Sequence, residues 1–184
     1  MGVAVNENVL NHRGYDDKQN EKRILIDIAK QCLVVYQGSN EIKRYLISSA
    51  LNGIGGQKNS GKTPLGKHVI RAKIGADCPL NTVFIGRRPT GEVFSEALKQ
   101  QHPDRDWILS RILWLSGCEA GINRLGDVDT MQRYIYIHGT PDSEPVGKPL
   151  SHGCIRMRNS DIVELFDWVE IATEVNIVSG NKEG

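Results

Sequence analysis

Residues 151–156 read Ser151-His152-Gly153-Cys154-Ile155-Arg156, and a second histidine, His138, stands a short loop earlier. His138 follows the run Arg133-Tyr134-Ile135-Tyr136-Ile137, whose aromatic and β-branched residues predict a buried strand. A strand that ends in His-Gly, followed by a loop that ends in His-Gly-Cys, can bring one imidazole to one thiol. Such a pair is the minimum for a cysteine nucleophile with its own base.

Cys154 and His138 are therefore the candidate nucleophile and base. A free thiol has a pKa of about 8.5, which a neighbouring imidazolium can lower to about 3.5–7.5. Gly153 permits a tight turn before the cysteine, and the amides of Gly153 and Cys154 can point at a developing oxyanion. In an extended segment Arg156 shares a face with Cys154, which suits contact with a substrate carboxylate or bracing of the loop.

These motifs resemble the catalytic domain of the L,D-transpeptidase (YkuD-type) family. The resemblance rests on Ile137-His138-Gly139-Thr140 and on Ser151 to Asn159, with a similar turn at Thr63-Pro64-Leu65-Gly66. It covers about residues 23–178. It implies a mainly β (α+β) fold, an L,D-transpeptidase-type β-sandwich with a C-terminal helix.

The resemblance also implies the site residues. Cys154 would be the nucleophile and His138 its base, with the backbone carbonyl of Gly139 orienting the imidazole. His152, Gly153 and Arg156 would shape the oxyanion hole and the substrate site. Ser151, which begins the second motif, and Tyr136, in the run before His138, are the other candidates for substrate binding. The loop between His138 and Ser151 is slightly short for the family, which leaves the shape of the acceptor side open.

Composition indicates one ordinary globular domain. The chain has 184 residues, a net charge of +1 and 39% hydrophobic residues. We expect a polar N-terminal segment over residues 1–21 and one catalytic domain over 22–180. The balanced charge argues against nucleic acid as a partner, and no apolar run approaches the ~18 residues of a spanning helix. The sequence leaves the oligomeric state open.

Local residue composition predicts mostly strands. The expected strands share β-branched or aromatic composition between turn residues: 23–29, 32–36, 42–48, 67–74, 82–87 and 175–178. A short helix is expected around residues 94–100, and residues 108–115 fit either a strand or a helix. A C-terminal helix should begin at one of three good N-caps, Asn159, Ser160 or Asp161, because Ile162 and Phe166 then share a face.

The four cysteines show no C-x-x-C pair. We expect Cys32 and Cys118 to be buried apolar filler, and at most one disulfide to be compatible with a reactive Cys154. His138, His152 and Cys154 are possible zinc ligands, but no fourth ligand stands at a recognisable spacing. No metal and no cofactor are therefore expected. A sortase-type Cys/His/Arg enzyme shares these residue types, although His-Gly-Cys-Ile-Arg fits the L,D-family better.

Residues Gly56–Thr63 match the phosphate-loop pattern G-x-x-x-x-G-K-[ST] residue for residue. A phosphate loop needs a helix to begin at its Lys-Thr end, so that free amides meet the phosphates. Pro64 and Gly66 oppose such a helix, and strand-like composition follows. A nucleotide-binding protein using this loop is therefore a remote alternative.

The resemblance implies the substrate, a murein stem tetrapeptide cleaved between the L-centre of its third residue and D-alanine. Water as acceptor would make the chain an L,D-carboxypeptidase of peptidoglycan recycling, whereas an amine would make it a cross-linking L,D-transpeptidase. Residues 1–20 are polar, without the apolar core of a signal peptide. This predicts a cytoplasmic enzyme and favours water, with a periplasmic location as the alternative if an export signal has been removed.

Overall fold

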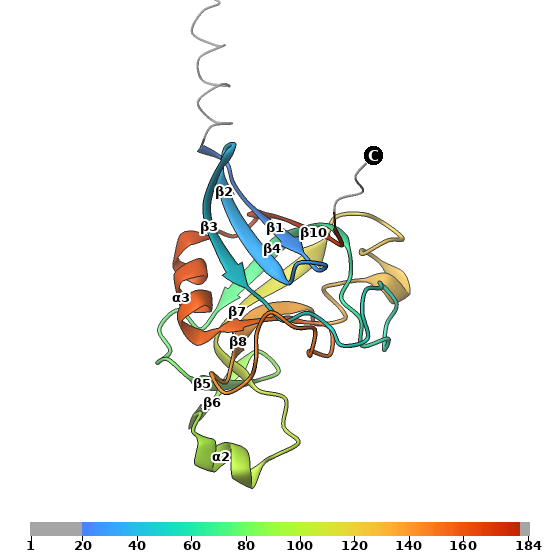
Figure 1. Cartoon of the computed structure of the whole chain (residues 1–184). Helices are drawn as coiled ribbons and strands as arrows, with labels where there is room; N and C mark the ends of the chain where they lie inside the picture. The colour runs from blue at the N-terminus through green and yellow to red at the C-terminus, as the bar shows by residue number, and fades with distance from the viewer. Residues whose placement is uncertain (1–19, 181–184) are drawn as a thin grey trace, which may run out of the picture.

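In the computed structural model, which describes residues 20–180, the strands form one curled sheet (Figure 1). The strands are β1 (Lys22–Asp27), β2 (Cys32–Gln37), β3 (Asn40–Leu46), β4 (Gly66–Ile74), β5 (Thr82–Ile85), β6 (Arg88–Val93), β7 (Ile108–Gly117), β8 (Tyr136–Thr140), β9 (Ile155–Arg158) and β10 (Glu174–Val178). Their order is β3-β2-β1-β10-β4-β7-β5-β6, with β8 beside β7 and β9 beside β8. The helices are α2 (Glu96–Gln101) and α3 (Asn159–Trp168), and a 3₁₀ turn spans Gly126–Val128.

The mainly β fold with a C-terminal helix confirms the expected fold class. The six expected strands are present with ends shifted by one or two residues, and the ambiguous segment 108–115 forms the long strand β7. No helix within residues 20–180 is long and apolar enough to cross a membrane.

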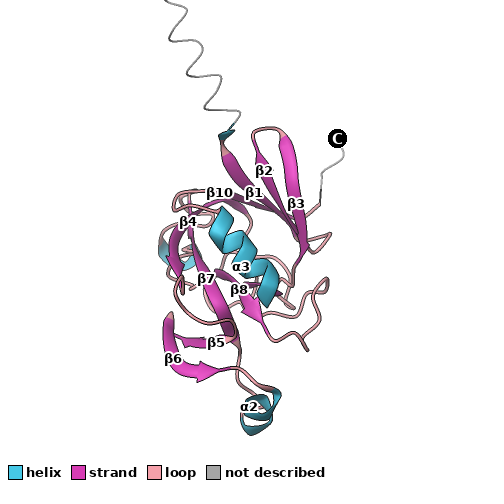
Figure 2. Cartoon of the chain, turned by 90° about the vertical axis from the view of Figure 1, so that its left-hand side faces the viewer, coloured by secondary structure: helices cyan, strands magenta, loops and turns pink. Residues whose placement is uncertain are grey.

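The main apolar core lies between the curled sheet and α3, which crosses the sheet near β7 and β8 (Figure 2). Alternation along β1 sends Ile24 and Ile26 into this core, as expected for a strand with one buried face. From α3, Ile162 and Phe166 meet them on the apolar face that the sequence predicted. β10 pairs with β1 in parallel, so the last strand of the chain lies beside the first within the sheet.

Three expectations about local structure are wrong. Arg133 and Tyr134 lie in a turn, with φ of 57° at Tyr134, and the strand runs from Tyr136 to Thr140. The amide of Tyr134 donates to the carbonyl of Met131, which closes the turn before the strand can begin. His138 therefore lies in the middle of β8 and not beyond its end.

The second error concerns the start of α3. Arg158 is its N-cap and provides no side-chain hydrogen bond, while Asn159 is already helical. The third concerns Cys118, which is exposed, whereas Cys32 is buried as expected. Cys118 follows the last residue of β7 and enters the next loop, where the alternation that would bury it has ended. All four cysteines are free thiols.

Candidate active site

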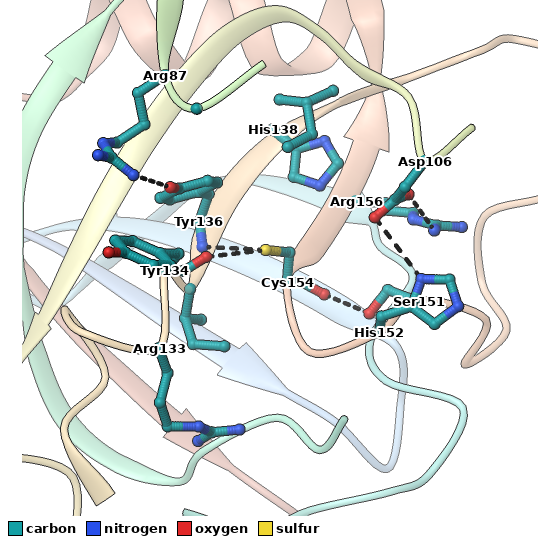
Figure 3. Close-up of a pocket in the computed structure, with 13 residues that line it drawn as sticks. Arg87, Asp106, Arg133, Tyr134, Tyr136, His138, Ser151, His152, Cys154 and Arg156 are labelled. Carbon is teal, nitrogen blue, oxygen red and sulfur yellow. Dashed lines mark hydrogen bonds and ion pairs between the residues drawn. The ribbon is translucent and has the colours of Figure 1, made fainter. Parts of the chain in front are cut away.

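A pocket of about 510 Å³ brings most of the predicted site residues together (Figure 3). Its walls come from β8, from the loop before β9, and from the tip of the β5–β6 hairpin. The predicted residues that line it are Tyr136, His138, Ser151, His152, Cys154 and Arg156. Gly139 and Gly153 act on the pocket through their backbones.

The His138 ring is held in one orientation and one tautomer. The side chain is 1% exposed, and its Nδ1 lies 2.8 Å from the carbonyl oxygen of Gly139. Because a carbonyl can only accept, Nδ1 carries the proton and Nε2 keeps a lone pair. Burial lowers the pKa of His138, against the opposing influences of the Gly139 hydrogen bond and of Asp106, so the ring is neutral near pH 7. A neutral imidazole with a free Nε2 can act as a general base.

The Cys154 thiol is not a preformed thiolate. Burial among the pocket walls raises its pKa to about 12, and a neutral His138 cannot reverse this. Its Sγ accepts from the amide of Tyr136 at 3.3 Å and donates to the carbonyl of Tyr134 at 3.4 Å. Within residues 20–180 no hydrogen bond joins Sγ to His138, and the sulfur points toward the two tyrosines (Figure 3). Proton transfer to His138 therefore requires the thiol to rotate.

Asp106 is a site residue that the sequence analysis missed. Its carboxylate accepts from Nη2 of Arg156 at 2.8 Å and lies 3.6 Å from Nδ1 of His152. Asp106 therefore holds the Arg156 guanidinium at the pocket, and the two roles expected for Arg156, contact with a substrate carboxylate and bracing of the loop, stay predictions. His152 is 78% exposed at the pocket rim. The only sequence signal for Asp106 is the charged run Asp104-Arg105-Asp106 just before β7. Charged runs of this kind are usually exposed to solvent in proteins and do not by themselves indicate a site.

The loop that carries the cysteine is shaped by two buried hydroxyl groups. Ser151 Oγ donates to the carbonyl of Cys154 at 2.6 Å and accepts from the amide of Gly153 at 3.3 Å. Thr63 Oγ1 donates to the carbonyl of Gly153 at 3.0 Å and accepts from the amide of Ala50. The Gly153 amide is thus engaged within the protein, which leaves the Cys154 amide as the candidate oxyanion donor of the two predicted. Gly153 has φ of 137°, where a side chain would be strained.

The phosphate-loop lookalike does not have the structure of a phosphate loop. No helix follows Lys62, and β4 begins at Gly66. Instead the loop wraps the guanidinium of Arg133, which donates to the carbonyls of Gly55 at 3.2 Å and Lys62 at 2.6 Å. The loop therefore anchors an arginine beside the pocket. Within residues 20–180 no cluster of three His, Cys, Asp or Glu side chains is placed to hold a metal ion.

Comparisons with known proteins identify the family of the chain. The L,D-transpeptidase catalytic domain model of the YkuD family matches residues 21–177. The curated relative YqjB of Bacillus subtilis is 48% identical over 46 residues, which are 25% of this chain and 26% of that protein. ErfK/SrfK of Escherichia coli is likewise 48% identical over 46 residues, 25% of this chain and 15% of its own length. These alignments thus span about a quarter or less of the curated relatives.

Solved structures share the fold. An L,D-transpeptidase from Mycobacterium smegmatis superposes with a TM-score of 0.51 at 17% identity, covering 86% of this chain and 59% of that one. Bd1075 of Bdellovibrio bacteriovorus gives a TM-score of 0.53 at 17% identity over 88% of this chain and 49% of that one. With a family model that matches most of its length, the chain belongs to the YkuD family of L,D-transpeptidase catalytic domains, a family of cysteine acyl-transfer enzymes.

Proposed function

We propose that this protein hydrolyses the bond between the third residue and D-alanine of murein tetrapeptides, as an L,D-carboxypeptidase. The observation that carries the proposal is the shared pocket of Cys154 and His138, with the His138 Nδ1 proton committed to Gly139. This arrangement gives one nucleophile and one oriented base, as thioester chemistry requires. We place this activity in the cytoplasm, on soluble recycled muropeptides.

The reaction follows from the resting protonation states. Cys154 Sγ attacks the carbonyl of the third residue while its proton moves to Nε2 of His138, so the imidazolium forms only as the C–S bond forms. The Cys154 amide faces the developing oxyanion. His138 then protonates the amine of D-alanine as the C–N bond breaks, leaving a thioester. Water attacks the thioester, gives its proton to His138, and releases the tripeptide and the Cys154 thiol.

The position of the loop after β8 supports water as the acceptor. The amide of Gly147 donates to the carbonyl of Ile47 at 2.7 Å, and the amide of Leu150 donates to the carbonyl of Ser49 at 2.9 Å. These bonds hold residues 147–150 against the chain that follows β3. None of residues 141–150 lines the main pocket. We therefore take the thioester to be open to water from this side.

One observation favours cross-linking as the second candidate function. A smaller hollow of about 180 Å³ adjoins the main pocket and shares Asp106, His152 and Arg156 with it. Thr140, Pro141 and Glu144 belong to its wall. An acceptor stem peptide seated there would bring its amine past the Asp106 carboxylate, and the chain would then act as an L,D-transpeptidase.

Product analysis separates the two functions. Purified protein is incubated with a soluble tetrapeptide, and the products are identified by mass spectrometry, with Cys154→Ala as the matched control. We expect tripeptide and free D-alanine as the main products, and neither with the control. If cross-linked dimers are the main product, the function is transpeptidation and not hydrolysis. Absence of both products from the unaltered protein would overturn both assignments.

A further inference from the structure

Three arginines line the Cys154 pocket against a single acid, and their hydrogen bonds differ. Arg156 is paired with the carboxylate of Asp106. Arg133 donates hydrogen bonds from both terminal nitrogens to backbone carbonyl oxygens of the glycine-rich loop. Arg87 makes one hydrogen bond, from Nη1 to the hydroxyl of Tyr136 at 2.8 Å. Within residues 20–180 no carboxylate pairs with it. Arg156 also makes a single side-chain hydrogen bond, but its partner is a carboxylate. Arg87 therefore combines a charge that has no carboxylate partner with a guanidinium that has most of its five N–H donors unused.

The backbone at Arg87 is held in a conformation that side chains disfavour. Gly86 and Arg87 form the two-residue turn between β5 and β6, with φ of 54° and 67°. Hairpin turns with two positive φ values favour Asn or Gly, and a left-handed arginine costs roughly 1–2 kcal/mol. Strain of this kind gathers at functional sites. Here the turn aims the guanidinium at the pocket wall (Figure 3).

Aromatic rings fix the guanidinium plane. The Arg87 Cζ lies 4.5 Å from the ring centroid of Trp114 and 4.8 Å from that of Tyr134. The centroids of these two rings are 6.4 Å apart, so the rings lie on adjacent sides of the guanidinium and not on its two faces. They shield part of the guanidinium from water and leave its remaining N–H groups for a planar, bidentate partner. Carboxylates match that geometry.

We propose that Arg87 binds a carboxylate of the acyl-donor peptide, in a subsite lined by Tyr134 and Tyr136, with Trp114 beside the guanidinium. This inference rests on the proposed function, because it names the group of the same substrate that the pocket recognises. The hydroxyl of Tyr136 contacts Arg87, and its backbone amide contacts Cys154 Sγ. A carboxylate at Arg87 therefore lies one tyrosine side chain away from the reacting sulfur. The C-terminal carboxylate of D-alanine and a side-chain carboxylate of the third residue are the two sources within that reach.

The test measures the activity of two Arg87 variants on a tetrapeptide and on its amidated forms. Arg87→Met keeps the length of the stem and the strain of the turn, Arg87→Lys keeps the charge, and Arg88→Met is the matched control on the exposed neighbour. The substrates are a tetrapeptide with a diamino-diacid third residue, its C-terminal amide, and its third-residue side-chain amide. We expect Arg87→Met to lower kcat/KM for the free acid roughly 10- to 100-fold, mostly through KM.

The amides identify the carboxylate. Amidating the recognised carboxylate should lower kcat/KM of the unaltered enzyme by a similar factor and should not lower that of Arg87→Met any further. Amidating the other carboxylate should leave the difference between the unaltered enzyme and Arg87→Met unchanged. Arg87→Lys should recover part of the loss, and Arg88→Met should behave as the unaltered enzyme. Equal losses by Arg87→Met on all three peptides would overturn the proposal, since they would mark a purely structural role.

Binding to Cys154→Ala keeps this inference separable from the proposed reaction. Calorimetry with the free acid and the two amides measures recognition without turnover. If no peptide is cleaved but binding depends on Arg87 and on one carboxylate, the proposed reaction fails and the subsite stands. If peptides are cleaved but binding is unchanged in the Arg87→Met, Cys154→Ala double variant, the subsite fails and the reaction stands. Absence of both cleavage and binding overturns both.

Discussion

At the scale of single residues, burial decides the protonation of both reacting groups. It lowers the pKa of His138 and raises that of Cys154 to about 12. The resting pair is therefore neutral, and the attacking sulfur loses its proton only as it reacts. This differs from the low thiol pKa that a neighbouring imidazolium would produce, because an imidazole buried to 1% exposure does not hold a proton easily.

Thiol labelling tests the neutral pair. From the sequence alone, a thiol reagent is expected to label Cys154 first; with a pKa near 12, Cys154 should instead react with iodoacetamide more slowly at pH 7.5 than the exposed Cys118. Its rate should still rise between pH 9 and 10.5, where an ordinary thiol of pKa about 8.5 has levelled off. Mass spectrometry of quenched digests measures both rates. A Cys154 rate that is already constant at pH 7 would show a preformed thiolate and contradict this.

The two histidines of the motif should differ in their effect on turnover. His138→Ala removes the oriented base and should lower kcat by roughly 10²–10⁴. His152→Ala should cost less, because its side chain is 78% exposed and its recorded partner is Asp106. Steady-state kinetics on a tetrapeptide gives both values. A larger loss from His152→Ala would exchange the two roles.

At the scale of elements, the glycine-rich loop before β4 supports the cysteine loop through one hydroxyl. Thr63→Val keeps the shape but removes the hydrogen bond to the Gly153 carbonyl at 3.0 Å. It should lower kcat about tenfold or more while the fold persists, and Thr63→Ser should recover most of it. Lys62→Ala in the same loop is the control. It should leave activity largely intact, and binding of ATP or GTP that Lys62→Ala abolishes would restore the phosphate-loop alternative.

The start of α3 is tied to the sheet by Asn159 and not by a helix cap. Its Nδ2 donates to the carbonyl of Thr140 at 2.7 Å, and its Oδ1 accepts from Ser110 Oγ at 2.6 Å. Asn159→Ala removes the acceptor of the buried Ser110 hydroxyl proton and the side-chain donor to the buried Thr140 carbonyl, so the free energy of unfolding should fall by about 1–3 kcal/mol. The exposed Ser160→Ala should stay within about 0.5 kcal/mol. Urea unfolding measures both, and equal small effects would refute this role of Asn159.

At the scale of the whole molecule, two buried neutral histidines make stability depend on pH. His68 is buried between the carbonyl of Gly66 and Thr130 Oγ1, and burial lowers its pKa as it lowers that of His138. An unfolded histidine titrates near pH 6.5. Below that pH the unfolded chain binds protons that the native state excludes. The stabilisation is therefore full above about pH 6.5 and is lost as the pH falls toward the lowered native values.

Thermal unfolding between pH 8 and 5 checks this dependence. Tm should be nearly level above pH 6.5 and should fall below it, because the free energy of unfolding decreases there by up to about 1.4 kcal/mol per pH unit for each histidine. His68→Gln, which retains hydrogen-bonding groups but does not titrate, should reduce the slope. A Tm that is level down to pH 5, or a slope unchanged in His68→Gln, would contradict the assignment.

The sequence by itself determined what depends on neighbours along the chain. The β-branched composition of segments such as 23–29, between turn residues, predicted strands. The apolar spacing of Ile162 and Phe166 predicted α3, and the two histidine motifs predicted the nucleophile and base candidates. Boundaries were least secure where a turn competes with a strand, as at Tyr134. There a hydrogen bond to Met131, and not the β propensity of the run, decides the backbone.

Only the tertiary structure decided which distant groups share the pocket. Asp106 reaches Arg156 across 50 positions, and Arg87 reaches Tyr136 across 49. Neither contact can be predicted from the local composition, because charged residues in loops are usually exposed to solvent and have no fixed partner. The pKa values of His138 and Cys154 were decided in the same way. Residue type supplies an imidazole and a thiol, whereas the burial that keeps both neutral exists only once the sheet has curled around them.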